Sequence, residues 1–128
     1  MTALESALEW LHIAELDLSS AVFLTGHCPL PVEIICFHCQ QSAEKCLKSF
    51  IVLNNINPQK THDLEGLCSQ CIEMSATFNS IVSHCQKLNK YSVNTRYPNE
   101  SSNTEQDMQR AIADAQAVLN FVKPLIVM

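Results

Sequence analysis

The sequence predicts an all-α protein, an up-and-down bundle of about five helices that forms one domain over residues 1–128. Apolar residues recur at spacings of three and four along five segments, as they do on one face of an amphipathic helix. The chain holds only two glycines and five prolines, too little turn material for the many short strands of an all-β fold. Hydrophobic residues make up 47% and charged residues 16%, a composition typical of a globular domain with one core.

The first helix is expected to run from the N-terminus to about Leu24. Thr2 and Glu5 have the spacing of a capping box, in which each side chain bonds the other residue's backbone N–H. Gly26 is suited to end the helix, and it cannot continue through Pro31. Its predicted buried stripe consists of Leu4, Ala7, Leu8, Leu11, Ala14, Leu18, Ala21 and Val22.

The second helix is predicted to begin near Pro31, a residue suited to a first helical position, and to end near Leu53. Spacing residues at about 100° separates two faces of this helix. The face expected in the core carries Cys36, Cys39, Ala43, Cys46, Leu47 and Phe50. The opposite, polar face carries Gln41, Glu44, Lys45 and Lys48, with His38 beside it. Three interpretations of that polar face stay open: a solvated surface, a groove for phosphate, or a dimer surface.

Three further helices are expected after the turn cluster at residues 54–58. The third starts around Thr61, and a break near Ser75 separates it from the fourth. Thr104 caps the fifth helix, and Pro124 is expected to end it. The residues expected in the core from these helices are Leu64, Leu67, Cys68, Cys71, Ile72, Phe78, Ile81, Val82, Cys85, Leu88, Met108, Ala111, Ile112, Ala115, Val118, Leu119 and Val122.

The charge of the chain limits its partners. The net charge is −5, and only two arginines occur, so no basic face of the kind that binds DNA through its phosphates is expected. The first residues lack a basic stretch followed by an apolar run, which predicts no secretory signal. No apolar stretch approaches the roughly 20 residues that span a bilayer, so no membrane association is expected. We therefore expect a cytoplasmic protein.

Seven cysteines include two Cys-x-x-Cys pairs, Cys36/Cys39 and Cys68/Cys71. Four thiolates can hold a structural zinc ion. Both pairs fall within predicted helical stripes, however, where a reduced cysteine behaves as a small buried hydrophobe. Packing in the core is therefore the favoured interpretation, and no metal is expected. The odd number of cysteines and the cytoplasmic prediction both indicate reduced thiols.

Two other groups of residues are candidates for binding. His62 lies at a predicted helix entrance, beside Lys60 and Asp63, and histidines can act as bases or ligands. The polar loop around Arg96 and Tyr97 combines a guanidinium group, whose N–H donors suit phosphate, with an aromatic ring that can stack on a base. Alternatively, Arg96 pairs with an acidic helix end while Tyr97 packs on the bundle. No glycine-rich phosphate loop is present, which excludes the common NTPase motifs.

Three segments resemble the HEPN domain (higher eukaryotes and prokaryotes nucleotide-binding domain). Residues 36–50 resemble its second helix, with the pattern Phe-x-x-Gln-Gln-x-Ala-Glu-Lys-x-Leu-Lys. Residues 60–64, Lys-Thr-His-Asp-Leu, resemble the entrance to its third helix, and residues 91–98 resemble its Tyr…Arg-Tyr-Pro segment. The three motifs occur in the family's order, and the resemblance covers nearly the whole chain.

The resemblance implies a helical bundle that commonly dimerises. Many such domains are encoded beside a small nucleotidyltransferase, and some of those pairs are toxin–antitoxin systems. Several branches are metal-independent ribonucleases that use an arginine followed, after four to six residues, by a histidine. No histidine follows Arg96 or Arg110 in this chain, so that ribonuclease site is not carried over. The resemblance therefore favours a binding protein over an enzyme, with no catalytic residues assigned.

The first hypothesis is a HEPN-type homodimer that binds a nucleotide such as ATP, or a nucleotidyltransferase partner, without a cofactor and without chemistry of its own. Its lysines and arginine would neutralise phosphate, His62 would donate a hydrogen bond, and Tyr97 would stack or accept a modification. The binding surface is expected to contain Gln41, Lys45, Lys48, His62, Arg96 and Tyr97. Two alternatives remain: a degenerate RNA-cleaving toxin that uses His62 as base and Arg96 as phosphate clamp, and a structural helical adaptor with no small ligand.

Overall fold

The computed structural model of the protein describes residues 1–93 and 103–127, and within them every regular element is helical. The prediction of an all-α bundle is confirmed. The elements are α1 (Ala3–Leu24), α2 (Val32–Leu53), α3 (Leu64–Met74), the 3₁₀ helix η1 (Ala76–Ile81), α4 (Val82–Asn89) and α5 (Glu105–Ile126).

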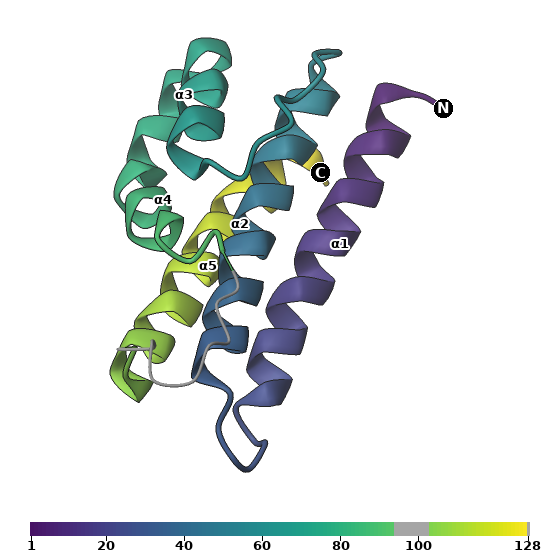
Figure 1. Cartoon of the computed structure of the whole chain (residues 1–128). Coiled ribbons are helices and arrows are strands. Elements are labelled where there is room, and N and C mark those ends of the chain that lie inside the picture. The colour runs from purple at the N-terminus through teal and green to yellow at the C-terminus, as the bar shows by residue number, and fades with distance from the viewer. Residues whose placement is uncertain (94–102, 128) are drawn as a thin grey trace.

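Helix α2 is the central element of the bundle (Figure 1). Helices α1 and α2 run antiparallel, and α5 packs along α2 in the same direction as α2 while also contacting α1. Helices α3 and α4 pack on α2 from another side, and α4 also packs on α5. Helix α2 is therefore contacted by all four other α-helices, which makes it the most enclosed segment of the described chain.

The helix starts follow the capping residues seen in the sequence. Glu5 donates its backbone N–H to the Thr2 hydroxyl (3.1 Å), and the Glu5 carboxylate accepts the Thr2 N–H (3.3 Å). The same reciprocal pair joins Thr104 to Asp107 at the start of α5. Both predicted caps are confirmed. Helix α3 starts slightly later than expected, because the Asp63 side chain caps it by accepting the N–H of Glu65.

Two predicted helix details are wrong. The fourth helix is divided into η1 and α4, since the turns of residues 76–81 wind more tightly than an α-helix. Pro124 does not end α5, which continues to Ile126. A proline removes only its own backbone donor, and in a last turn the loss of one hydrogen bond is small. The N–H of Val127 still bonds the carbonyl of Lys123 across the proline (2.9 Å).

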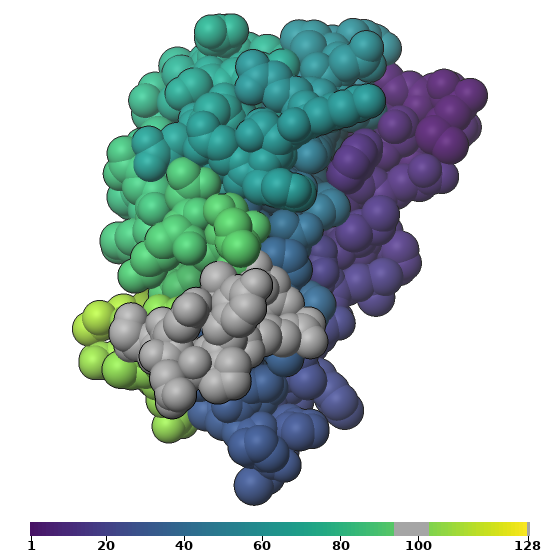
Figure 2. Space-filling view, viewed as in Figure 1, coloured from purple at the N-terminus to yellow at the C-terminus, as the bar shows by residue number. Residues whose placement is uncertain are grey.

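The stripe predicted for α1 is buried only in part. Ala7, Leu11, Ala14, Leu18 and Ala21 lie in the core, whereas Leu4, Leu8 and Val22 are 40–50% exposed. These three residues lie at the edge of the stripe, where the neighbouring helices cover them only in part. Ile13, Leu16 and Phe23 are also exposed, so the outer face of α1 carries apolar side chains among polar ones such as Glu9 and His12, and Figure 2 shows α1 along one edge of the molecule.

The core is filled by aliphatic side chains, three contacting phenylalanines and thiols. Phe78 packs between Phe50 and Phe121, with ring centroids 4.5 and 5.0 Å away in tilted and edge-to-face arrangements. Six of the seven cysteines are buried and Cys28 is exposed, which confirms the core interpretation of both Cys-x-x-Cys pairs. Among the described residues, no three histidine, cysteine or acidic side chains are grouped so as to hold a metal ion. No helix in the described part of the chain is long and apolar enough to cross a membrane.

Candidate functional site

The polar face predicted for α2 is largely covered. Glu44 is 1% exposed and Lys48 is 8% exposed, so the interpretation of a solvated face is wrong for these two residues. The reason is the central place of α2. The chain that leaves its C-terminus turns back, and the segment just before α3 lies against α2, with the His62 carbonyl accepting a hydrogen bond from the Gln40 amide (2.8 Å).

Glu44 is the centre of a cluster of polar side chains. One carboxylate oxygen accepts the Nδ1–H of His62 at 2.7 Å. The other accepts the ammonium groups of Lys45 at 3.1 Å and Lys48 at 3.2 Å. The Gln41 amide lies 3.5 Å from the first oxygen. We call Gln41, Glu44, Lys45, Lys48 and His62 the Glu44 cluster.

The electrostatics of this cluster favour an ionised Glu44. Burial alone raises the pKa of this carboxyl, but the hydrogen bond from His62 and the attraction of Lys45 and Lys48 outweigh it, and the net pKa is lowered. One buried carboxylate thus lies within ion-pair distance of two ammonium groups. With a neutral imidazole on His62 the cluster carries a net charge of +1, in a protein whose net charge is −5.

A second layer of contacts holds the cluster in place. The Gln41 amide donates to the Gln40 side-chain oxygen (2.8 Å), and the Gln41 oxygen accepts from Lys45 (2.9 Å). The ammonium group of Lys48 lies 5.6 Å from the ring centre of Trp10 on α1, a cation–π contact. These contacts fix the lysines and the backbone at His62, so the site is organised before any ligand arrives.

His62 is the most accessible member of the Glu44 cluster, with 67% of its side chain exposed. Its bond to a buried carboxylate sets the neutral tautomer, because Nδ1 must carry the proton that Glu44 accepts. The other ring nitrogen, Nε2, then presents a lone pair. A carboxylate-oriented imidazole of this kind can accept a proton from a ligand, and once protonated it can donate to an anion.

The structure brings together four of the six predicted site residues, namely Gln41, Lys45, Lys48 and His62. Arg96 and Tyr97 lie outside the described residues. The prediction does not include Glu44, Gln40 or Trp10. The glutamine pair and Glu44 belong to the helix-2 motif and could have been included on that signal, whereas nothing in the spacing connects Trp10 to the site.

Two further histidines, His38 and His84, also pair with carboxylates. His38 Nδ1 lies 3.1 Å from Asp17, which joins α2 to α1. His84 Nδ1 lies 2.7 Å from Asp114, which joins α4 to α5. Both histidines are partly buried between helices, so their positions indicate roles in helix packing.

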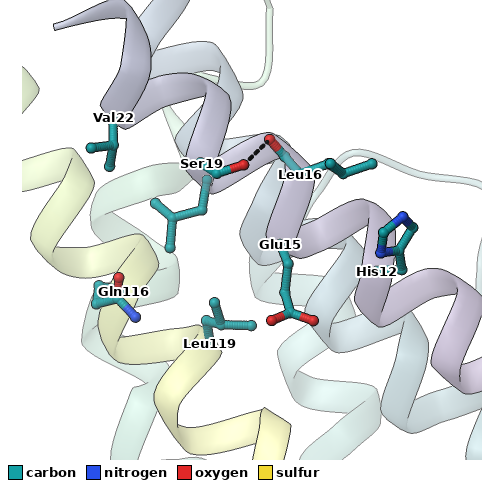
Figure 3. Close-up of a pocket in the computed structure, with 8 residues that line it drawn as sticks. His12, Glu15, Leu16, Ser19, Val22, Gln116 and Leu119 are labelled. Carbon is teal, nitrogen blue, oxygen red and sulfur yellow. Dashed lines mark hydrogen bonds between the residues drawn. The ribbon is translucent and has the colours of Figure 1, made fainter.

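A separate open groove of about 520 Å³ lies between α1 and α5 (Figure 3). Leu16, Val22 and Leu119 make it mainly apolar, and His12 and Glu15 are its ionisable residues. The groove adjoins the outer face of α1. It holds none of the residues of the Glu44 cluster, and its apolar character is suited to protein contact.

Comparisons with known proteins agree with this architecture. The crystal structure of TT1696 from Thermus thermophilus superposes with a TM-score of 0.79 at 26% identity, covering 92% of this chain and 96% of that one. The crystal structure of ST0689, an archaeal HEPN homologue, gives a TM-score of 0.74 at 27% identity, covering 94% and 97%. No protein of curated function is significantly similar to the chain. The model of the HEPN domain matches residues 7–125, and the chain therefore belongs to the HEPN domain family.

Proposed function

We propose that this HEPN protein is a nucleotide-binding module that holds a ligand's phosphate at the Glu44 cluster, with no cofactor. The observation that carries the proposal is the convergence of Lys45, Lys48 and His62 on one buried carboxylate. Glu44 orders three donors that would otherwise be mobile, and its single charge does not neutralise them. Preorganised donors bind an anion with less loss of conformational entropy than free side chains do.

Donor counting supports this assignment. The ammonium of Lys45 has three N–H groups, and its bonds to Gln41 and Glu44 use two of them among the described residues. One donor of Lys45 is thus available to a ligand, together with Nε2 of protonated His62. Lys48 is too buried for broad contact and would contribute mainly through its charge.

The proposed partner is a small nucleotidyltransferase, beside which many HEPN domains are encoded. In such a pair the transferase would supply the nucleotide, and the HEPN chain would present the Glu44 cluster to it. A toxin–antitoxin relationship between the two proteins is part of this proposal. Its support is the family membership of the chain.

We further propose that the chain works as a homodimer that buries the outer face of α1. Leu8, Ile13, Leu16 and Phe23 are 40–83% exposed along this helix, among polar residues, and the burial of these apolar side chains in an interface is favourable. Light scattering after gel filtration should give the mass of two chains. Leu16→Glu should yield a monomer, because it buries a charge in the interface, while the control Ile56→Glu, at an exposed site in the turn after α2, should stay dimeric. A monomeric wild type would refute the dimer.

Calorimetric titration with ATP tests the nucleotide site. Lys45→Ala and His62→Ala should each weaken binding about tenfold, the usual effect of losing one charge-assisted hydrogen bond. The control Lys123→Ala removes an exposed lysine that pairs with Glu15 on α1 and should leave the affinity unchanged. Circular dichroism checks that every variant is folded. Unchanged affinity in both cluster variants, or no binding by the wild type, would overturn the assignment.

A second candidate function is RNA cleavage, favoured by the pairing of His62 with Glu44. The exposed Nε2 could take a proton from a ribose 2′-hydroxyl while the neighbouring lysines stabilise the phosphate. The test is cleavage of single-stranded RNA in the presence of chelator. Activity that is lost in His62→Ala would support a ribonuclease. Inactivity of the wild type toward RNA, combined with no ATP binding, would favour the adaptor hypothesis.

A further inference from the structure

A small pocket of about 80 Å³ lies between α4 and the first turns of α5, apart from the Glu44 cluster. Three of the eight lysine and arginine residues of the chain surround it: Lys87, Lys90 and Arg110. The remaining polar lining comes from Tyr91, Asp107 and Asp114. Three cations around one pocket are unexpected on a protein whose net charge is −5.

Among the described residues, none of the three cations lies within 4 Å of a carboxylate oxygen. The ion pairs found there involve other lysines and histidines. The contacts of the three cations are weaker ones, such as the ammonium of Lys90 at 5.2 Å from the Tyr91 ring centre. Like charges held around one cavity repel one another unless an anion lies between them. The two aspartates of the pocket are such anions, and three cations against two carboxylates leave its lining with a formal charge of +1, which favours one further anion.

The two aspartates of the pocket are already occupied by donors within the fold. The Asp107 carboxylate accepts the backbone N–H of Thr104 (2.8 Å), and that bond lowers its pKa as part of the α5 capping box. Asp114 is 8% exposed and accepts the Nδ1–H of His84 (2.7 Å). These bonds orient both carboxylates without removing their charge, and the attraction of Lys90 and Arg110 also contributes to the lowered pKa of Asp107. The lysines and the arginine remain able to contact a ligand.

Two of the residues that line the pocket, Tyr91 and Ala111, are buried. Tyr91 is 8% exposed, and its hydroxyl shares a hydrogen bond with the thiol of Cys36 on α2. Burial raises the pKa of Tyr91, which keeps this hydroxyl protonated and neutral. Ala111, 2% exposed, closes the pocket from the α5 side.

We propose that this pocket binds a phosphate group, as a second site distinct from the Glu44 cluster. Its volume is suited to one tetrahedral oxyanion and is too small for a base and sugar, which would have to lie outside. The Arg110 guanidinium can offer two parallel N–H donors to one phosphate, and Lys87 and Lys90 add point charges. A nucleotide's phosphate and the free ion present the same group to these side chains, so the shared chemistry defines the site.

Titration of the isotope-labelled full chain with sodium phosphate, followed by amide chemical shifts at constant ionic strength, tests the pocket. Saturable shifts are expected at Lys87, Tyr91, Arg110 and Ala111. Arg110→Gln should weaken binding about tenfold, in line with the loss of a charge-assisted bidentate contact. The control Lys123→Gln, on the last turn of α5 and paired with Glu15, should bind as the wild type does.

Two further experiments are needed. One distinguishes a nucleotide's phosphate from the free ion, and the other distinguishes this pocket from the Glu44 cluster. Tighter binding of AMP than of phosphate at the same residues identifies a nucleotide's phosphate, and equal binding identifies the free ion. Lys45→Ala should leave the phosphate-induced chemical shifts of the pocket residues unchanged. The result for the pocket therefore does not depend on whether the Glu44 cluster binds a nucleotide. Shifts that stay linear with concentration, occur only at residues 41–48 and 62, or persist at full strength in Arg110→Gln would overturn the proposal.

Discussion

Replacing Glu44 by glutamine removes one charge from the interior and keeps the shape of the side chain. The native carboxylate side chain is 2% exposed and accepts hydrogen bonds from His62, Lys45 and Lys48. The amide of glutamine has one oxygen and one NH₂ group. At least one lysine or His62 would therefore face a donor, and two lysines would lose their counter-charge.

The size of the effect follows from the burial of the partners. Removing one partner from a buried ion pair costs about 3–5 kcal/mol. The His62 side chain is 67% exposed and can be solvated after the substitution. The Lys48 side chain is only 10% exposed and lies against the Trp10 ring. The cost should therefore lie near the lower end, at about 3 kcal/mol. For a domain of this length that loss corresponds to a fall in Tm on the order of 10 °C.

Urea unfolding followed by circular dichroism measures this difference, with Glu73→Gln, an exposed site on α3, as the matched control. The control should stay within about 0.5 kcal/mol of wild type. Because folding lowers the pKa of Glu44 from an ordinary 4.5, its contribution is present above that pH and lost as the pH falls through the folded-state pKa. The gap between wild type and Glu44→Gln should thus close below about pH 4.5. A Glu44→Gln protein as stable as wild type at pH 7 would refute the reasoning.

Three further predictions concern the core and the helix ends. Cys28 alone should react quickly with a thiol reagent in the native protein, and all seven cysteines should react in concentrated guanidinium chloride. Phe78→Ala should destabilise the fold by about 3–5 kcal/mol in urea unfolding, because it removes the ring between Phe50 and Phe121. Thr104→Ala should cost about 1 kcal/mol by loss of the α5 cap, measured as a fall in Tm.

The helices are predictable because their signals are local. Thr2 and Thr104 mark helix starts through bonds that reach only three residues along the chain. The periodic stripes of α2 and α5 depend on neighbours one turn away. The errors lie where a local rule is given too much weight. Pro124 would break a helix interior but is tolerated in a last turn, and residues 76–81 form a tighter 3₁₀ helix whose winding the apolar spacing does not reveal.

The candidate site can be predicted only in part, because the burial of Glu44 depends on a contact between distant segments. A single helix shows which residues share a face, and Gln41, Lys45 and Lys48 are correctly grouped on that basis. It does not show what covers the face. Glu44 is enclosed because α2 is packed on several sides and because His62, 18 residues later, returns to bond it. A glutamate beside two lysines weakens a basic surface when all three are solvated. Once it is buried, the same glutamate organises the lysines, so its role follows from the fold and not from its neighbours in sequence.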